Sequence, residues 1–257
     1  MSTKIAWTNE TWNPVSGCTK VSAGCKFCYA EAVTERFGNG RKFSDVVLHP
    51  ERLDIPLHWR KPRKVFVNSM SDLFHEKVPV AFIERVWTKM HVAHKDRGHI
   101  FQVLTKRPQR MLEVLGPRGF GWYATEGPVA RPEPGIWLGV SCENQETANE
   151  RIPFLLQTPT AIRFASLEPL LGPVDFHIIP EFNKCGSAGQ ALLDNFWVIV
   201  GGESGPHART MNIEWLESIV EQCKVAGVPV WVKQDSGRFP GKQGRIPDRL
   251  WIHQFPK

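Results

Sequence analysis

The sequence predicts an α/β fold in which six to seven parallel strands form a partial (β/α) barrel. Apolar runs of strand length alternate with amphipathic stretches of helical period, which is typical of repeated β-α units. Each apolar run ends in polar or ionisable residues, and in such barrels the chemistry lies at the carboxyl ends of the strands. A chain of 257 residues is long enough to bury the core of one large domain of this kind.

The predicted strands are runs rich in β-branched and aromatic residues. They occupy residues 64–68, 99–104, 136–140, 161–165, 196–200 and 228–232, with a weaker seventh run at 11–15. Apolar residues spaced three to four apart predict helices over 80–93 and 213–223, and Gly227 ends the second. The Met and Trp residues on these stretches are expected in the core.

We predict one domain over residues 1–257. Two long connections, 116–135 and 172–195, are rich in Gly or Pro and are expected to be surface insertions or lids within it.

The strand ends carry a repeated polar signal. Turn formation and helix capping explain any single Ser or Asn there, but six consecutive ends with this character favour one functional edge. The segments are 69–72, 105–107, 141–144, 166–168, 201–204 and 233–236.

Three cysteines gather within eleven residues, at Cys18, Cys25 and Cys28. Four thiolates saturate a zinc ion or complete an iron–sulfur cluster, whereas three leave one metal position open for a ligand. The alternative is a structural zinc completed by a distant histidine such as His49 or His75. Spacing alone leaves both interpretations open.

Composition narrows the class of protein. The chain has no apolar run long enough to span a membrane, no signal-peptide pattern, and six Cys of which three cluster, so we expect a cytoplasmic protein with reduced thiols. A net charge of +6 favours a polyanionic partner, although such an excess is also found on ordinary solvated surfaces. The cations concentrate in residues 60–64, 106–110 and 238–249.

These motifs together resemble the radical S-adenosylmethionine superfamily, and more narrowly the three-Cys-motif proteins of tailed phages and bacteria. The similarity spans nearly the whole chain. It is carried by residues 18–30, 67–74, 104–108, 166–170 and 200–205.

The resemblance implies a [4Fe-4S] cluster on Cys18, Cys25 and Cys28, with S-adenosylmethionine on the open iron as the source of a 5′-deoxyadenosyl radical. It also implies an external electron donor such as flavodoxin or ferredoxin. Phe27 would pack near the adenine. The other residues implied in cofactor binding are Ser69, Ser71, Asp72, Glu168, Gly201, Gly202 and Glu203.

The sequence departs from the superfamily pattern at two places. Six residues separate Cys18 from Cys25, where three are usual, and Gly-Gly-Glu follows a late strand instead of the second. We therefore weigh a catalytic, substrate-contacting role for Glu203. Cys142 is a candidate hydrogen donor or a small buried residue, and His75 is a candidate acid or base or a structural histidine.

The resemblance further suggests that the substrate is DNA with a substituted thymine, on which the enzyme acts as an isomerase in the host cytoplasm of a phage infection. Base hypermodification at an unactivated carbon requires hydrogen abstraction, which radical chemistry provides. The basic segments would hold phosphates while aromatic residues stack on an extruded base. The alternatives are a radical enzyme acting on a peptide or free nucleotide, and a zinc-stabilised nucleic-acid-binding protein without catalysis.

Overall fold

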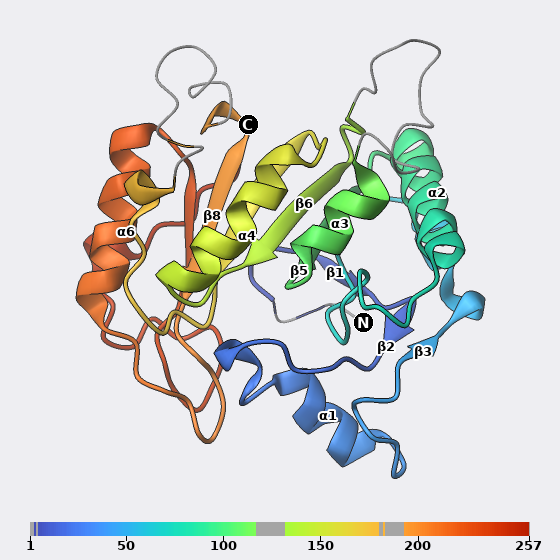
Figure 1. Ribbon diagram of the computed structural model, residues 1–257, viewed down its shortest axis with the longest axis horizontal. Coiled ribbons are helices and arrows are strands. Elements are labelled where there is room, and N and C mark those ends of the chain that lie inside the picture. Colours follow the sequence, from blue (N-terminus) through green and yellow to red (C-terminus); the bar gives the residue numbers. More distant parts are fainter. Residues whose placement is uncertain (1–2, 4, 117–131, 180–181, 183–192, 257) are drawn as a thin grey trace. The chain divides into compact units, whose positions relative to one another are not determined.

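Figure 1 shows the computed structural model, which describes most of the chain. The chain splits into two compact units. Unit 1 comprises Met1–Leu138 and Gln157–Ala161, and unit 2 comprises Gly139–Leu156 and Ile162–Lys257. The described residues are 3, 5–116, 132–179, 182 and 193–256. The expected insertions lie largely outside them, and the single domain stays a prediction.

A seven-stranded sheet has the order β1-β4-β5-β6-β7-β8-β9, so neighbouring strands follow one another along the chain. Its pairs β1/β4 and β4/β5 in unit 1, and β7/β8 and β8/β9 in unit 2, are parallel. The predicted α/β fold with a partial (β/α) barrel is confirmed. The strands are β1 (Glu10–Trp12), β4 (Lys64–Val67), β5 (Ile100–Thr105), β6 (Ile136–Ser141), β7 (Ile162–Leu167), β8 (Phe196–Gly201) and β9 (Val230–Gln234).

The weak run at 11–15 forms two short strands instead of one. β1 joins the large sheet, whereas β2 (Val15–Ser16) pairs antiparallel with β3 (Val47–Leu48). Pro14 lies between them, and proline supplies no N–H to a sheet ladder. This break brings the chain out of the sheet immediately before Cys18.

The predicted helix over 80–93 is α2 (Val80–Arg97), which buries a stripe at helical spacing and ends at Gly98 with φ 69°. Figure 1 shows α2 beside α3 (Pro108–Leu115). Helices α3 and α1 (Tyr29–Phe37) are present in addition to the predicted helices. The 3₁₀ turns of unit 1 are Ala23–Cys25, Pro50–Arg52 and Ile55–His58. Among the described residues, no helix has the length and hydropathy to cross a membrane.

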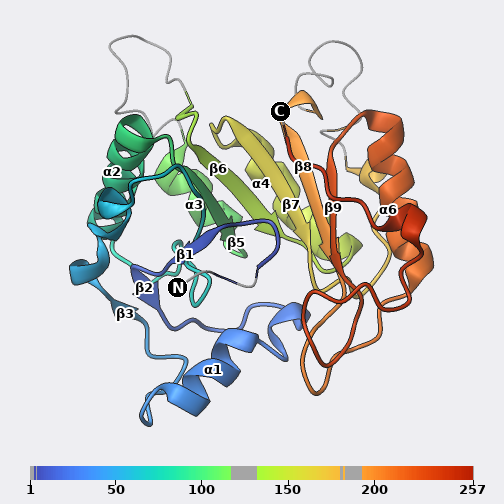
Figure 2. The same cartoon turned by 180° about the vertical axis from the view of Figure 1, so that it is seen from behind.

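In unit 2 the predicted helix over 213–223 is α6 (Ile213–Ala226), which packs on β8. Asn212 caps its first turn through Glu214 N, and Gly227 ends it at φ 69°. The remaining elements are α4 (Gln145–Gln157) and the 3₁₀ turns Phe176–Ile178 and Asp248–Leu250. Figure 2 shows β7, β8 and β9 side by side.

Gly139 in β6 is required by the packing of its neighbour in β7. A Cβ placed on Gly139 would lie 2.4 Å from Cε2 of Phe164, which is fully buried and packs against Trp197 at a ring-centroid distance of 5.9 Å. A ring held on both sides has no low-energy rotamer in which to yield.

We predict that Gly139→Ala lowers the free energy of unfolding by about 1–3 kcal/mol, because the added methyl overpacks this core. Urea titration followed by circular dichroism measures the change. Gly237→Ala is the matched control, since nothing lies within 4 Å of an added Cβ there. Equal midpoints for both variants would contradict the close approach of Phe164.

Candidate functional site

The buried carboxylate of Asp72 joins the carboxyl ends of β4 and β5 in unit 1. Its Oδ1 accepts hydrogen bonds from the Phe74 amide (3.0 Å) and the Thr105 hydroxyl (2.8 Å). Its Oδ2 accepts from the Lys106 amide (3.0 Å) and from Nη1 of Arg107 (3.3 Å). Both oxygens are therefore engaged by the protein, and we call this set the Asp72 network.

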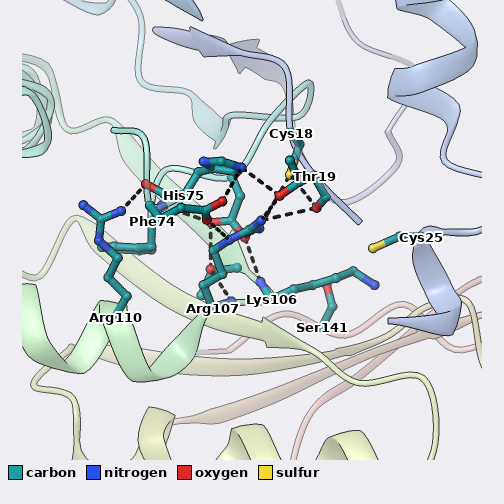
Figure 3. A network of polar contacts seen from close by, with 12 residues as sticks. Cys18, Thr19, Cys25, Phe74, His75, Lys106, Arg107, Arg110 and Ser141 are labelled. Atoms are coloured by element: carbon teal, nitrogen blue, oxygen red, sulfur yellow. Dashed lines mark hydrogen bonds and ion pairs between the residues drawn. The ribbon is translucent and has the colours of Figure 1, made fainter. Parts of the chain in front are cut away.

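Arg107 extends the Asp72 network to the first cysteine (Figure 3). Its Nη2 donates to the Thr19 hydroxyl (2.8 Å) and carbonyl (3.3 Å), while Nη1 lies 3.6 Å from Sγ of Cys18. Its Nε donates to Glu76 (3.2 Å). A guanidinium presents donors in a fixed fork, so one side chain fixes the cysteine segment relative to the strand ends.

His75 is fully buried beside this network. Its Nδ1 accepts from the Lys77 amide (3.1 Å), so the ring proton of the neutral form is on Nε2, which donates to the Thr19 hydroxyl (2.9 Å). Arg110 donates to the carbonyls of His75 and Val78. The structure therefore gives His75 a positioning contact and no exposed nitrogen with which to act as an acid or base.

The cysteine loop, residues 17–28, is held against the turn that follows β4. Gly17 adopts φ 88°, and its amide donates to the Met70 carbonyl (3.1 Å). A Cβ there would lie 2.2 Å from the Asp45 carbonyl oxygen, so only glycine fits. Helix α1 begins directly after Cys28, and the hydroxyl of Tyr29 donates to the Ser69 carbonyl.

The three thiols are half-buried and differ in acidity. Burial, together with the negative charge of Asp72, raises the pKa of Cys18 to about 11. Burial also raises the pKa of Cys28 above its ordinary value. For Cys25, burial acts in the same direction, but the positive charge of Lys106 and nearby hydrogen bonds outweigh it and the pKa is lowered. Cys25 is therefore the most acidic of the three.

Other predicted cofactor residues of unit 1 lie at this edge, with their hydroxyls in use. Ser69 Oγ donates to Oδ1 of Asn13 (3.2 Å), and Ser71 Oγ donates to the Val15 carbonyl (2.9 Å). The half-buried Phe27 has the Lys26 ammonium 5.3 Å from its ring centroid. The structure brings these residues beside the cysteine loop as structural supports.

The identity of a metal on the cysteine loop stays a prediction, and the two alternatives make different geometric demands. Zinc requires every donor about 2.0–2.3 Å from one point, whereas the thiolates of a cluster bind different irons. Within the described part of the chain, no three His, Cys, Asp or Glu side chains converge on one ion. The proposed fourth zinc ligands are engaged, because His49 bonds Ser16 (2.7 Å) and Glu51 (3.0 Å), and His75 bonds as above.

In unit 2 the buried carboxylates of Glu203 and Asp235 each bind an arginine from a following loop. Glu203 accepts from the amide, Nε and Nη2 of Arg209 at 2.9, 2.8 and 2.5 Å. Asp235 accepts from the same three groups of Arg245 at 2.8, 2.9 and 2.7 Å. Bidentate pairs of this kind are strong and orient both partners. A ligand that met Glu203 would have to displace Arg209.

Glu168, at the end of β7, pairs with residues of β9. Its Oε1 accepts from Nζ of Lys233 (2.5 Å) and from Nε2 of Gln234 (3.3 Å). Gly202 admits the neighbouring loop, since a Cβ there would lie 2.3 Å from the Ser236 amide nitrogen. The close approach of the Ser236 backbone explains a glycine at 202, and the implied role of Gly202 in cofactor binding stays a prediction.

Two further predicted residues of unit 2 have structural surroundings. The Gly201 carbonyl accepts from the Leu170 amide (2.9 Å), which ties the segment after β7 to the end of β8. Cys142 is fully buried, and its amide donates to the Ser166 carbonyl (2.9 Å). Full burial is typical of a small core residue, and the role of Cys142 as a hydrogen donor stays a prediction.

The sequence analysis assigned no carboxylate partner to the cations that organise these sites. Arg107 is the second residue after β5 and Lys233 is the penultimate residue of β9, so their positions carried a signal that we assigned only to the edge as a whole. Arg209 and Arg245 lie six and ten residues from the carboxylates they bind, inside loops without periodicity. Thr19 likewise depends on the fold of the cysteine loop.

The predicted basic segments of unit 1 lie at different ends of the strands. Lys64 is the first residue of β4, so residues 60–64 are at the amino end of that strand and the Asp72 network is at its carboxyl end. Arg63 pairs with Glu10 (2.5 Å) and stacks on Trp59 (5.3 Å). The expectation that residues 60–64 hold phosphates stays a prediction, and their position assigns any such contact to the opposite end of β4 from the Asp72 network.

Comparison with known proteins gives one match. A family model described as "Protein of unknown function (DUF5131)" matches residues 2–248. No curated protein matches the chain. No solved structure matches it either.

We predict that iodoacetamide alkylates Cys25 of the metal-free protein faster than Cys18 or Cys28 near neutral pH, because a lower pKa gives more thiolate. Peptide mass spectrometry over time measures the three rates. Lys106→Ala removes the cation that lowers the Cys25 pKa and should slow that site alone. A faster reaction at Cys18 in the native protein would contradict the assigned pKa order.

We also predict that the protein loses stability as the pH falls below about 6.5, the pKa of unfolded histidine. Burial and Arg107 lower the pKa of His75, and burial lowers that of His99. The unfolded chain then binds protons that the folded chain does not, so acid favours unfolding. Urea unfolding at pH 7.5 and 5.5 measures the slope, and His75→Gln should make it shallower. An unchanged slope in that variant would show that groups other than His75 cause the loss of stability in acid.

Proposed function

Since the chain belongs to the DUF5131 family, whose description assigns no function, we propose one from its own residues: a radical S-adenosylmethionine enzyme that acts on a substituted thymine in DNA. The observation that carries this proposal is the cysteine loop. Its three thiols are half-buried. Arg107 connects the loop to the carboxyl ends of β4 and β5 through its contacts with Cys18 and Thr19. In parallel α/β folds that edge is where chemistry occurs.

Cys18, Cys25 and Cys28 would hold the [4Fe-4S] cluster, and the thiol environment supports this assignment. A cluster with three thiolates carries negative charge, and the cations Lys106 and Arg107 act on these sulfurs. When bound, the cluster and S-adenosylmethionine supply a carbon-centred radical able to abstract hydrogen from an unactivated carbon. Acid–base side chains do not provide that chemistry at neutral pH.

The chain's own residues fix the position of the cysteine loop. Arg107 fixes Cys18 and Thr19, while Asp72 holds Arg107 and is itself held by two backbone amides. His75 completes the support by donating to the Thr19 hydroxyl. Contacts that hold the loop in one conformation would reduce the conformational entropy lost when a cluster binds.

DNA as the substrate is supported by the net charge of +6. Of the basic segments, residues 106–110 supply Arg107 and Arg110 to internal contacts, whereas exposed cations remain at residues 238–249. An isomerisation of the thymine substituent, with an external flavodoxin or ferredoxin as electron donor, completes the proposal. A nucleic-acid-binding protein without catalysis is the competing outcome.

We predict that Cys18→Ser, Cys25→Ser and Cys28→Ser each lose iron, sulfide and the visible chromophore after anaerobic reconstitution, because each removes one cluster ligand. The variants should stay folded, since the loop lies outside the core. Cys223→Ala, which changes a buried thiol of α6, is the control and should keep the metal. Zinc in place of iron, or full iron content in all three variants, would refute the cluster.

Activity is measured as 5′-deoxyadenosine formed under a chemical reductant, with DNA carrying a substituted thymine, the free nucleotide, or a peptide added. We expect DNA to stimulate the formation of 5′-deoxyadenosine. If the base is isomerised, the structure of the base changes while the mass of the DNA stays the same. Stimulation by nucleotide or peptide alone would keep the radical chemistry and reject DNA. DNA binding without 5′-deoxyadenosine would favour the non-catalytic outcome.

A further inference from the structure

Two loops of unit 2 continue the parallel pairing of β8 and β9 beyond the strand ends (Figure 2). We call residues 202–211 and 235–246 the paired loops. The Gly237 amide donates to the Glu203 carbonyl (3.0 Å), and the Gly205 amide donates to the Gly237 carbonyl (3.0 Å). Ser204 and Gly237 form a parallel bridge. The two loops therefore form one connected structure.

The base of the second loop is closed by backbone and side-chain hydrogen bonds. The Asp235 amide donates to the Lys242 carbonyl (2.8 Å), and the Gly241 amide donates to Oε1 of Gln234 (2.9 Å). Arg245 binds the Asp235 carboxylate and also donates to the Met211 carbonyl of the first loop (3.0 Å). These contacts hold both ends of the second loop while its middle projects into solvent.

The projecting segment presents an aromatic ring with one cation beside the ring and a second cation three residues further along the chain. Phe239 is 64% exposed, and Cζ of Arg238 lies 5.8 Å from its ring centroid. Arg238 and Lys242 are exposed, and within the described residues neither has a carboxylate at ion-pair distance. Burial of a phenylalanine side chain is worth about 1.5–3 kcal/mol, so a ligand that covers Phe239 would gain free energy of that size.

The ligand chemistry follows from the ring and the charges. A single exposed ring beside Pro240 and Gly241 offers too little apolar area for a stable protein interface. An aromatic face flanked by cations is instead the arrangement that stacks on an unpaired base and contacts its phosphates. Duplex DNA keeps its bases stacked on one another and does not offer that face.

We propose that the paired loops bind single-stranded or extruded DNA, with Phe239 stacking on a base and Arg238 and Lys242 contacting the adjacent phosphates. The proposal rests on the DNA substrate of the proposed function and is independent of the cluster. It assigns the DNA contact to a segment that the cysteine loop does not include.

The test is the affinity of the purified full chain for a fluorescent oligothymidine of about 16 nucleotides, measured by anisotropy at low salt. Phe239→Ala should weaken binding by about 5- to 150-fold, and Phe239→Trp should retain it. Arg238→Ala and Lys242→Ala should each weaken binding and reduce the log–log salt slope by about 0.7. Ile178→Ala and Lys224→Ala, at exposed positions of the same unit, are the matched controls and should bind as the native chain.

Equal affinity of Phe239→Ala and the native protein would overturn the proposal, as would equal competition by duplex or by an acidic peptide. The outcome is separable from that of the proposed function. Loss of binding in Phe239→Ala without any 5′-deoxyadenosine from the native protein would keep the surface and reject the enzyme. DNA-stimulated 5′-deoxyadenosine with binding unchanged in Phe239→Ala would keep the enzyme and reject the surface.

Discussion

The buried carboxylate of Asp72 is the interaction on which the candidate site depends. It accepts four hydrogen bonds, from the turn after β4 and from the end of β5, and one of them orients Arg107. Arg107 in turn holds Thr19 and approaches the thiol of Cys18. Without the carboxylate, a half-buried guanidinium and two strand ends would lose their common partner. A buried charge whose partner is removed is costly, so this network fixes where the cysteine loop can lie.

Unit 2 uses the same chemical device for a different purpose. Glu203 and Asp235 are nearly inaccessible to solvent, and each is bound through a fork of donors by an arginine that closes a loop. Such carboxylates at strand ends have the sequence appearance of catalytic acids. Their hydrogen bonds show that they shape the paired loops. Glu203 and Asp235 are buried, so the exposed charged side chains of these loops are cations, and they lie on the same loops as one exposed aromatic ring, Phe239. The exposed charge of the paired loops therefore suits an anionic ligand.

The thiols differ because their surroundings differ. Cys18 faces Asp72 as well as Arg107, whereas Cys25 is under the influence of Lys106. Metal ligation requires thiolates, so the cations near the loop would favour assembly of the proposed cluster and would partly balance its charge. Cys25, as the most acidic of the three thiols, would be the one most readily available as a thiolate.

The sequence by itself determined the strands, the two long amphipathic helices and the clustering of the thiols, because each of these is local: alternation of apolar segments, helical spacing, and close cysteines along the chain. It also placed polar residues at the strand ends. Only the tertiary structure decided which of them are engaged. No sequence feature of Asp72 or Glu203 shows whether its carboxylate is bound by an arginine or is available to a ligand. The packing of strands and loops brings the partners Arg107 and Arg209 to these carboxylates. Partner choice is a property of distances in space, and those are set by the fold.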